Sequence, residues 1–256
     1  MTTPEEVRRE IVRVCARLDT RQYVAGTDGN VSALLGQEDT LLITPSGRAK
    51  GEMVAEDLLV LGRAGKVREG RGTPSSETGM HLRIYDLRPD VKAVVHAHPP
   101  VATGFAAAGA DLSECVLPEV ILGLGGVPVA AYGTPGTEDL SRSLDPWIAD
   151  HDAVLLANHG VVTVGSCVSS AYRRMETVEH AARVLLVARL LGGAHPLGRE
   201  QVERLLDERG RHGIREGLAS CGVSTPRSGG LSDADRQLAA TIADRVRDSL
   251  RGDSNR

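Results

Sequence analysis

The sequence predicts an α/β fold in which one mixed β-sheet is flanked by helices. Short apolar runs bounded by glycine, proline or polar residues recur as far as Val164, as expected of buried strands. Segments whose apolar residues recur every three or four positions, as in helices, lie between these runs. The chain has 256 residues, of which 41% are hydrophobic, so it can bury a full core.

The first predicted element is a helix. Thr3 followed by Glu6 forms a capping box, Pro4 takes the first helical position, and an apolar stripe continues to about residue 19. Residues 26–30 contain two glycines and are predicted to form a turn. Four short strands follow, which we place at Val31–Leu35, Thr40–Thr44, Leu58–Leu61 and Lys66–Arg68.

Helices and strands alternate after a predicted loop over residues 70–76. Apolar residues at helical spacing predict four helices, at Glu77–Asp86, Val101–Ala108, Glu138–Ile148 and Cys167–Leu191. Apolar runs predict buried strands or strand-like edge segments at Val91–His96, Val116–Leu122, Val127–Tyr132, Ala153–Leu156 and Val161–Val164.

The composition changes after His195-Pro196. We therefore predict one α/β domain over residues 1–193 and a helical C-terminal tail over residues 194–256. The tail should contain a charged helix at Leu197–Arg211, a linker rich in Gly, Ser and Pro near 221–231, and an amphipathic helix at Asp233–Arg251.

Composition excludes several functions. The net charge of −4 and the pI near 6.1 give no reason to expect binding to nucleic acid or to a membrane surface. No apolar run approaches 18 residues, and no signal peptide opens the chain. The four cysteines are scattered without a CxxC pair, which fits a reducing compartment and no disulfide framework. We expect a cytoplasmic protein with no nucleic-acid or membrane partner.

Three histidines and one glutamate form a candidate metal site. His96 and His98 are two residues apart at the end of a predicted strand, so their side chains project from the same face. His159 directly follows the apolar run Ala153–Leu156, and Glu77 lies at the predicted start of a helix. Three imidazoles and one carboxylate suit a borderline divalent ion such as Zn²⁺, with room for substrate oxygens. The other five histidines have no partner at ligand spacing, and we interpret them as structural or solvated.

Three polar loops form a candidate anion pocket. They are rich in glycine or hydroxyl groups and lie at the ends of predicted elements; their members are Gly29, Asn30, Thr44, Ser46, Gly47, Ser75 and Ser76. Backbone N–H groups and hydroxyls of this kind donate to phosphate oxygens, and Ser75-Ser76 would lie at a helix N-terminus. Each loop alone is also compatible with an ordinary turn.

The motifs together resemble the class II aldolase/adducin family, with the fuculose-phosphate aldolases as the most similar branch and the ribulose-phosphate 4-epimerases as a sister branch. The resemblance covers about residues 5–192. It rests on Gly-Asn-Val-Ser (29–32), Thr-Pro-Ser-Gly (44–47), Ser-Ser-Glu (75–77), His-Ala-His-Pro (96–99), Ala-Tyr-Gly-Thr-Pro-Gly-Thr (131–137) and Asn-His-Gly (158–160). It implies a three-layer α/β/α sandwich around a mostly antiparallel sheet, and homotetramers with sites at subunit interfaces.

The resemblance also implies a reaction. A Zn²⁺-dependent aldolase would cleave a ketose 1-phosphate into dihydroxyacetone phosphate and an aldehyde through a metal-bound enediolate, with one ion per subunit. By position, the zinc ligands fall on Glu77, His96, His98 and His159, and Glu77 would also move the proton at the reacting carbon. The phosphate site falls on the three polar loops. A sugar-phosphate epimerase, or a dehydratase of the methylthioribulose-1-phosphate type, stays open as an alternative, as does another divalent ion. Adducin-like binding proteins of the family lack the metal ligands, which are all present here.

The acid that completes the reaction has no direct match. The family's tyrosine falls on Leu117, and the chain has no tyrosine after Tyr172. Glu119 is the nearest titratable residue. As a strand residue it would share a face with Leu117 and could reach across a subunit interface. We predict that Glu119 is a general acid/base, with an ordinary surface glutamate as the alternative.

Overall fold

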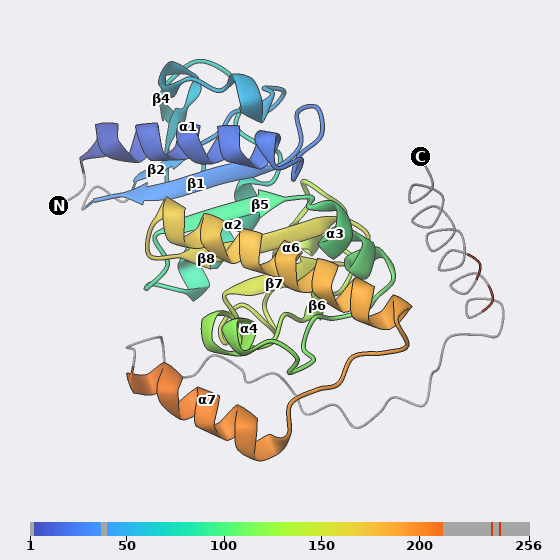
Figure 1. Ribbon diagram of the computed structural model, residues 1–256. Helices are drawn as coiled ribbons and strands as arrows, with labels where there is room; N and C mark the ends of the chain where they lie inside the picture. The colour runs from blue at the N-terminus through green and yellow to red at the C-terminus, as the bar shows by residue number, and fades with distance from the viewer. Residues whose placement is uncertain (1–2, 37–39, 212–236, 238–240, 242–256) are drawn as a thin grey trace, which may run out of the picture.

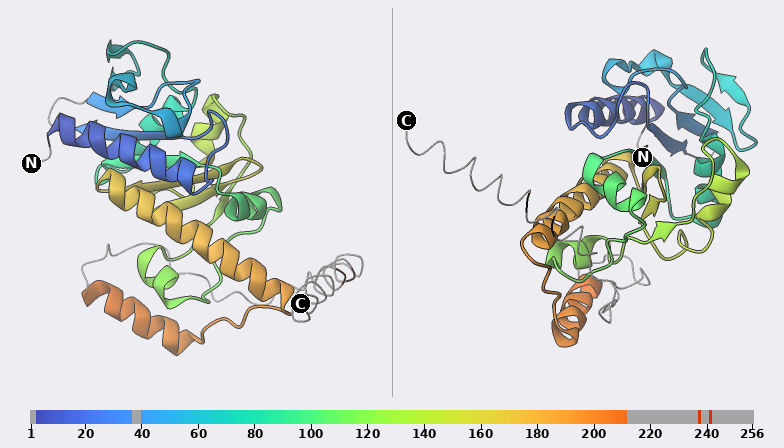
Figure 2. Two further views of the ribbon diagram at one scale, coloured as in Figure 1. Left: turned by 45° about the horizontal axis from the view of Figure 1, so that its top comes forward. Right: turned by 90° about the vertical axis from the view of Figure 1, so that its right-hand side faces the viewer.

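The computed structural model describes residues 3–36 and 40–211, together with residues 237 and 241. Its centre is one eight-stranded β-sheet with helices on both faces, and Figures 1 and 2 show the sheet between these two groups of helices. The predicted three-layer α/β/α arrangement around a mostly antiparallel sheet is therefore confirmed.

The strands are β1 (Asn30–Leu35), β2 (Thr40–Ile43), β3 (Leu59–Gly62), β4 (Val67–Glu69), β5 (Ala93–Ala97), β6 (Val129–Ala130), β7 (Ala153–Leu156) and β8 (Gly160–Gly165). Their order across the sheet is β4-β3-β2-β1-β5-β8-β7-β6. Every neighbouring pair is antiparallel except β6 and β7. β5 lies between β1 and β8, and this central position fixes where its C-terminal end meets the loops of both neighbours.

The two faces of the sheet bury separate apolar clusters, because successive strand residues point to opposite sides. On one face the strands pack against α1 (Pro4–Thr20), α3 (Pro100–Ala107) and α6 (Val168–Leu190). On the other face they pack against α2 (Thr78–Leu87) and α5 (Glu138–Ser143). Even-numbered residues of β1 and β5 face α2. The side chains of Asn30, Ser32 and His96 therefore lie on that side of the sheet.

The predicted start of α1 is confirmed by its capping box. The Thr3 hydroxyl accepts a hydrogen bond from the Glu6 backbone N–H, and the Glu6 carboxylate accepts one from the Thr3 backbone N–H. α6 buries most of its predicted apolar face, but Leu186 near its end is 41% exposed.

The prediction of a strand-like segment at Val116–Leu122 is wrong, because residues Pro118–Gly123 form a helix, α4. Pro118 occupies the first helical position, where its missing N–H costs nothing. Val120 and Ile121 then bury in two different clusters. A short apolar run is ambiguous between helix and strand by periodicity alone. α5 is also shorter than predicted, and two short 3-10 helices, η1 (Lys50–Glu52) and η2 (Ala55–Asp57), were not expected.

The tail begins with α7 (Arg199–Arg211), which packs on α4 through Val202, as Figure 1 shows at the bottom. The linker predicted near 221–231 lies outside the described residues, as does the helix predicted at Asp233–Arg251 apart from residues 237 and 241. Cys15 and Cys167 are free. Among the described helices, none combines the length and apolar character needed to cross a membrane.

Candidate metal centre

The sheet brings the predicted metal ligands together at one end of β5. His96 lies in the strand, and His98 follows it directly. The pairing of Ala97 with Val161 brings the turn between β7 and β8, which carries His159, alongside that end. Asn158 in this turn has a φ of 56°, a left-handed conformation that asparagine tolerates.

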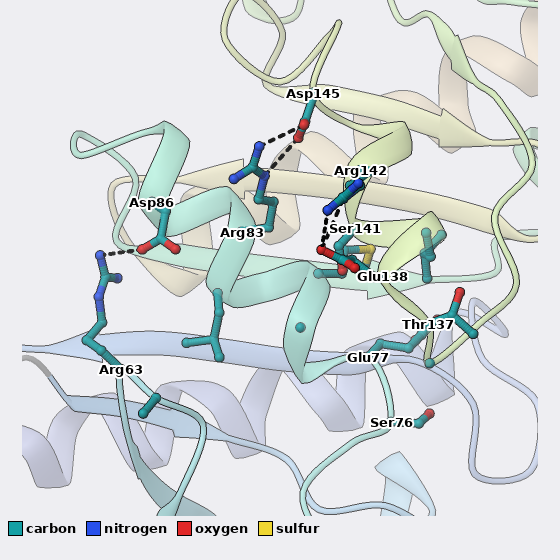
Figure 3. Close-up of a pocket in the computed structure, with 16 residues that line it drawn as sticks. Arg63, Ser76, Glu77, Arg83, Asp86, Thr137, Glu138, Ser141, Arg142 and Asp145 are labelled. Carbon is teal, nitrogen blue, oxygen red and sulfur yellow. Dashed lines mark hydrogen bonds and ion pairs between the residues drawn. The ribbon is translucent and has the colours of Figure 1, made fainter.

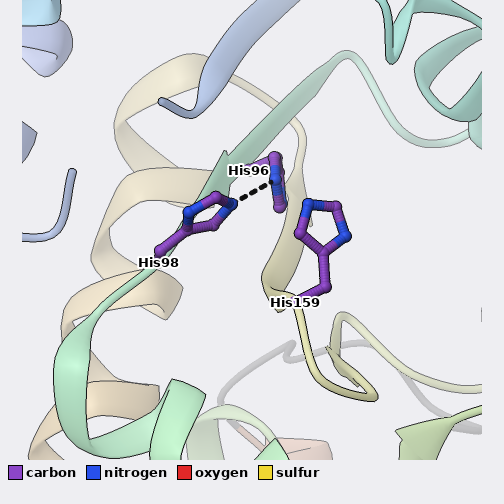
Figure 4. A group of neighbouring side chains, drawn as sticks. All are labelled: His96, His98 and His159. Atoms are coloured by element: carbon purple, nitrogen blue, oxygen red, sulfur yellow. Dashed lines mark hydrogen bonds between the residues drawn. The ribbon is translucent and has the colours of Figure 1, made fainter. Parts of the chain in front are cut away.

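The three imidazoles face one another, as Figure 4 shows. Their ring centroids are 4.9 Å apart for His96 and His98, 4.8 Å for His96 and His159, and 5.1 Å for His98 and His159. One ring nitrogen from each lies within 4.8 Å of the other two. Nitrogens bound to one tetrahedral Zn²⁺ lie about 3.4 Å apart, so the group needs only small movements to bind an ion.

The Glu77 carboxylate completes the group from the N-cap of α2. Its Oε2 is 3.2 Å from Nε2 of His96, and its Oε1 is 3.1 Å from Nε2 of His159. Burial alone would raise the pKa of Glu77. The neighbouring His96 and hydrogen bonds from His159 and Asn30 outweigh burial and hold this pKa well below its usual range.

Partners outside the group orient two of the rings. Nδ1 of His96 lies 2.9 Å from the Val161 carbonyl oxygen, to which it donates, and Nδ1 of His98 lies 3.3 Å from Oδ2 of Asp28. Burial lowers the pKa of His96 to about 3 and also lowers that of His98, so both rings stay neutral at pH 7. Their Nε2 atoms therefore carry lone pairs and no hydrogen.

These lone pairs make the residues fit a cation. The Nε2 atoms of His96 and His98 are only 3.0 Å apart, and neither has a hydrogen to share. Glu77 Oε1 is buried beside them, and its nearest partner is Nε2 of His159 at 3.1 Å. Three acceptors facing one another repel unless a positive ion lies between them. The donor set of three imidazoles and one carboxylate matches the ligands of divalent zinc.

Two glycines allow the close packing around the histidines. A Cβ on Gly160 would lie 2.5 Å from Cδ2 of His98 and 2.7 Å from the Ala97 carbonyl oxygen. Gly29 has a φ of 72°, and a Cβ there would lie 2.8 Å from the His96 carbonyl oxygen. Both glycines are required for the backbone to approach β5 this closely.

The candidate phosphate loops lie next to one another. An isolated bridge joins Pro45 to Pro74, and the Ser46 N–H donates to the Thr73 carbonyl. Ser46, Gly47 and Ser76 are exposed, and Ser75 is half-buried at the start of α2, where its hydroxyl accepts from the Glu77 N–H. These loops therefore present donors on one side of the site.

Thr44 and Asn30 of the same predicted set are directed inward. Thr44 is buried, and its hydroxyl accepts from the Val31 N–H, so it supports β1. Asn30 is also buried, and its side-chain amide donates to Glu77 over 2.6 Å. A phosphate contact from either residue stays a prediction.

A cavity of about 670 Å³ adjoins Ser76 and Glu77 and extends along the outer side of α2 toward α5. Figure 3 shows three arginines in its lining, each in an ion pair with a carboxylate: Arg63 with Asp86, Arg83 with Asp145, and Arg142 with Glu138. Their charges are already balanced, so this cavity is not where we expect a phosphate to bind.

Glu119 is not part of this group. It is exposed in the first turn of α4, and the reasoning that it shares a strand face with Leu117 is wrong. Within the described residues it makes no hydrogen bond or ion pair with Glu77 or the histidines. A role across a subunit interface stays a prediction.

Sequence reasoning missed two neighbours of the site, His81 and Asp28. Asp28 orients His98, and His81 is fully buried behind Asn30, with its Nε2 2.5 Å from Asn30 Oδ1. The structural interpretation of His81 is therefore correct and the solvated one is not. The signal available in the sequence was its position one helical turn after Glu77.

Comparisons with known proteins agree with this geometry. The family described as Class II Aldolase and Adducin N-terminal domain matches residues 9–186. An L-fuculose phosphate aldolase of Methanococcus vannielii is 36% identical over 176 residues, which are 69% of this chain and 93% of that protein. A 3-oxo-tetronate 4-phosphate decarboxylase of Pectobacterium atrosepticum is 35% identical over 191 residues, which are 73% of this chain and 87% of that protein.

A solved structure of an L-fuculose 1-phosphate aldolase has the same fold. It superposes with a TM-score of 0.75 at 31% sequence identity, over 81% of this chain and 97% of its own.

Proposed function

Because the chain belongs to the class II aldolase and adducin family, we propose that it is a metal-dependent aldolase that cleaves a ketose 1-phosphate, similar to L-fuculose 1-phosphate, into dihydroxyacetone phosphate and an aldehyde. The observation that supports this proposal most strongly is the buried convergence of three imidazoles and the Glu77 carboxylate. A binding protein of the adducin kind would have no use for four intact ligands held this closely.

His96, His98 and His159, with Glu77, would hold one divalent ion, and the ligand set favours Zn²⁺. The ion would supply Lewis acidity, which polarises a carbonyl and stabilises negative charge on the substrate oxygens. Asp28 and the Val161 carbonyl keep two of the imidazoles aimed at this position.

Glu77 would move the proton at the reacting carbon. Breaking the carbon–carbon bond leaves an electron pair on the carbon that becomes part of dihydroxyacetone phosphate, and that carbon must gain a proton. Glu77 lies among the proposed metal ligands and is ionised at rest, so it would first take up a proton, from water or from the group that receives the hydroxyl proton of the leaving aldehyde, and would then pass that proton to the carbon. The leaving aldehyde carbon carries a hydroxyl whose proton must go to another group. Glu119 of a neighbouring subunit remains our candidate for that group, within a homotetramer.

The phosphate would bind to neutral donors. Ser46, Gly47, Ser75 and Ser76 supply hydroxyl and backbone N–H groups, and the two serines at 75 and 76 precede the N-terminus of the ten-residue helix α2. Phosphate binding would position the substrate so that its reacting carbon lies beside Glu77.

A second candidate reaction is the decarboxylation of a 3-oxo acid 4-phosphate, which the 35% identity to such a decarboxylase favours. Loss of CO₂ from a 3-oxo-tetronate 4-phosphate leaves the same three-carbon ketone phosphate that aldol cleavage releases. The same histidines and Glu77 would therefore serve both reactions. Decarboxylation differs in one requirement, because no base is needed for the hydroxyl of a leaving aldehyde.

The experiment that separates these reactions measures both products. Metal-loaded protein is supplied with ketose 1-phosphates or with a 3-oxo acid 4-phosphate, and dihydroxyacetone phosphate is followed by a coupled NADH assay. Aldehyde and CO₂ are measured in parallel. We expect dihydroxyacetone phosphate and aldehyde in equal amounts. Equal amounts of dihydroxyacetone phosphate and CO₂ would establish the decarboxylase instead. Isomerised or dehydrated sugar phosphate without dihydroxyacetone phosphate would indicate the epimerase or dehydratase alternative.

A further inference from the structure

α2 presents a polar stripe to the sheet. Glu77, His81 and Tyr85 are spaced by four residues and so lie on one side of the helix. Facing them from β1 are Asn30 and Ser32, two residues apart and on the same strand face. All five side chains are buried, with at most 6% of any residue exposed. The metal site requires only the first of them, so the burial of the other polar groups needs an explanation.

Hydrogen bonds connect these five residues in one chain. The Tyr85 hydroxyl is 2.8 Å from the Ser32 hydroxyl, which is 2.6 Å from Nδ1 of His81. Nε2 of His81 is 2.5 Å from Oδ1 of Asn30. The Asn30 side-chain nitrogen is 2.6 Å from Oε2 of Glu77. The chain therefore alternates between helix and strand and ends on the carboxylate.

The direction of each hydrogen bond follows from the carboxylate. Ionised Glu77 can only accept, so Asn30 must present its NH₂ group to Glu77 and its oxygen to His81. Nε2 of His81 must then carry the hydrogen. Burial lowers the pKa of His81 to about 4, so the ring is neutral and its Nδ1 is an acceptor. Ser32 donates to that nitrogen and accepts from Tyr85. Every donor in the chain points toward Glu77.

We propose that His81 is a positioning residue for Glu77, acting through Asn30. The inference rests on the proposed role of Glu77 in proton transfer. A flipped Asn30 amide would place its oxygen against the carboxylate and its NH₂ against the N–H of His81, so both contacts would become repulsive. The N–H of His81 thus fixes the amide, and the amide fixes one oxygen of Glu77. This oxygen therefore keeps a fixed donor, and the carboxylate would keep one orientation whether or not it binds an ion.

Substitutions at position 81 test the positioning role. Glutamine keeps an N–H donor at about the reach of Nε2, whereas leucine has a similar size and no donor. We expect kcat of His81→Leu to fall by about 10- to 100-fold, the usual effect of losing a partner behind a metal ligand. KM should change by less than about threefold, because the substrate contacts are untouched. His81→Gln should recover most of kcat. Equal kcat for the two variants, after correction for the folded fraction, would overturn the proposal.

Two buried tyrosines provide a matched control. Tyr85 and Tyr172 are both almost fully buried, and each hydroxyl makes a side-chain hydrogen bond. Tyr172 bonds to Glu176 in α6, on the opposite side of the sheet from α2, and is not part of the chain to Glu77. Tyr85→Phe should lower kcat by a few fold, because Ser32 loses the donor that sets its orientation. Tyr172→Phe should leave kcat unchanged. The same kcat for both variants would contradict the proposed chain of hydrogen bonds from Tyr85 to Glu77.

A measurement on the unsubstituted protein is independent of any activity. Long-range ¹H–¹⁵N spectra of the histidine rings distinguish the Nε2–H from the Nδ1–H form, and the His81→Gln spectrum assigns the signal. We expect His81 to be neutral and protonated at Nε2 between pH 6 and 8. An Nδ1–H ring would overturn the inference even in an active aldolase. The expected ring in a protein without aldolase activity would refute only the proposed function.

Discussion

Substitution of Gly160 by alanine is expected to weaken metal binding, because the added methyl group would displace the His98 imidazole. The added Cβ would lie 2.5 Å from Cδ2 of His98, about 1 Å closer than the ~3.5 Å at which two carbons pack. β8 cannot retreat easily, because Val161 is paired with Ala97 of β5 in the adjacent strand. The His98 imidazole must therefore move by about 1 Å, whereas ligand distances in metal sites hold within about 0.2 Å.

The size of the loss in metal affinity and activity follows from that displacement of His98. We expect the dissociation constant for Zn²⁺ to rise by at least 10- to 100-fold, and kcat/KM to fall by about 100-fold, the typical cost of misplacing a site group by 1 Å. The new contact with the Ala97 carbonyl, at 2.7 Å, should also lower the free energy of unfolding by about 1–3 kcal/mol.

Gly104 in α3 provides the control, because a Cβ there would have no heavy atom within 4 Å. Gly104→Ala should leave metal affinity unchanged and raise the free energy of unfolding by about 0.5–1 kcal/mol. Competition with a chelator measures the affinity, and urea unfolding of the metal-free proteins measures stability. Parental Zn²⁺ affinity in folded Gly160→Ala would refute His98 as a ligand in this arrangement.

Three further substitutions test the other assigned groups. Glu77→Gln keeps the shape of the side chain but accepts no proton, so turnover should fall by about two to four orders of magnitude while the three histidines still retain the ion, though more weakly; undiminished turnover would leave Glu77 a ligand only. Ser75→Ala should raise KM more than it lowers kcat, and inorganic phosphate should compete with substrate; equal turnover of unphosphorylated sugars would contradict the phosphate site. Glu119→Gln should reduce aldol cleavage by at least ~100-fold with metal content and oligomeric state unchanged; near-normal turnover would assign that proton transfer to another group.

The convergence of the three histidines was predictable because its signal is local. His96 and His98 share a strand face by the two-residue period, and His159 follows a second apolar run. Only the sheet shows that these strands are neighbours, since β5 pairs with β8 and the β7–β8 turn therefore lies at the end of β5.

Contacts that depend on strand register were not predictable. Asn30 pairs directly with His96 across β1 and β5, and this register directs its amide at Glu77. A sequence shows that Asn30 lies in a polar loop but does not show which partner it faces. The sequence shows that His81 lies one helical turn after Glu77. A single histidine on a helix is nevertheless interpreted as a structural residue until its hydrogen-bond partners are known.

The prediction for residues 116–122 failed for a different reason. Apolar runs of this length fit a strand and a short helix equally well, and Pro118 at the first helical position decided for the helix. The interpretation of Glu119 as a strand residue depended on that choice, so it failed with it.

The metal content of the purified protein tests the central claim most directly. After dialysis against metal-free buffer, elemental analysis should find about one divalent ion per chain, predominantly zinc, and the His96→Ala variant should contain almost none. Chelation should abolish turnover, and added Zn²⁺ should restore it. A protein that turns over its substrate without a bound ion would contradict the account, as would a His96→Ala variant that keeps one ion per chain and full turnover.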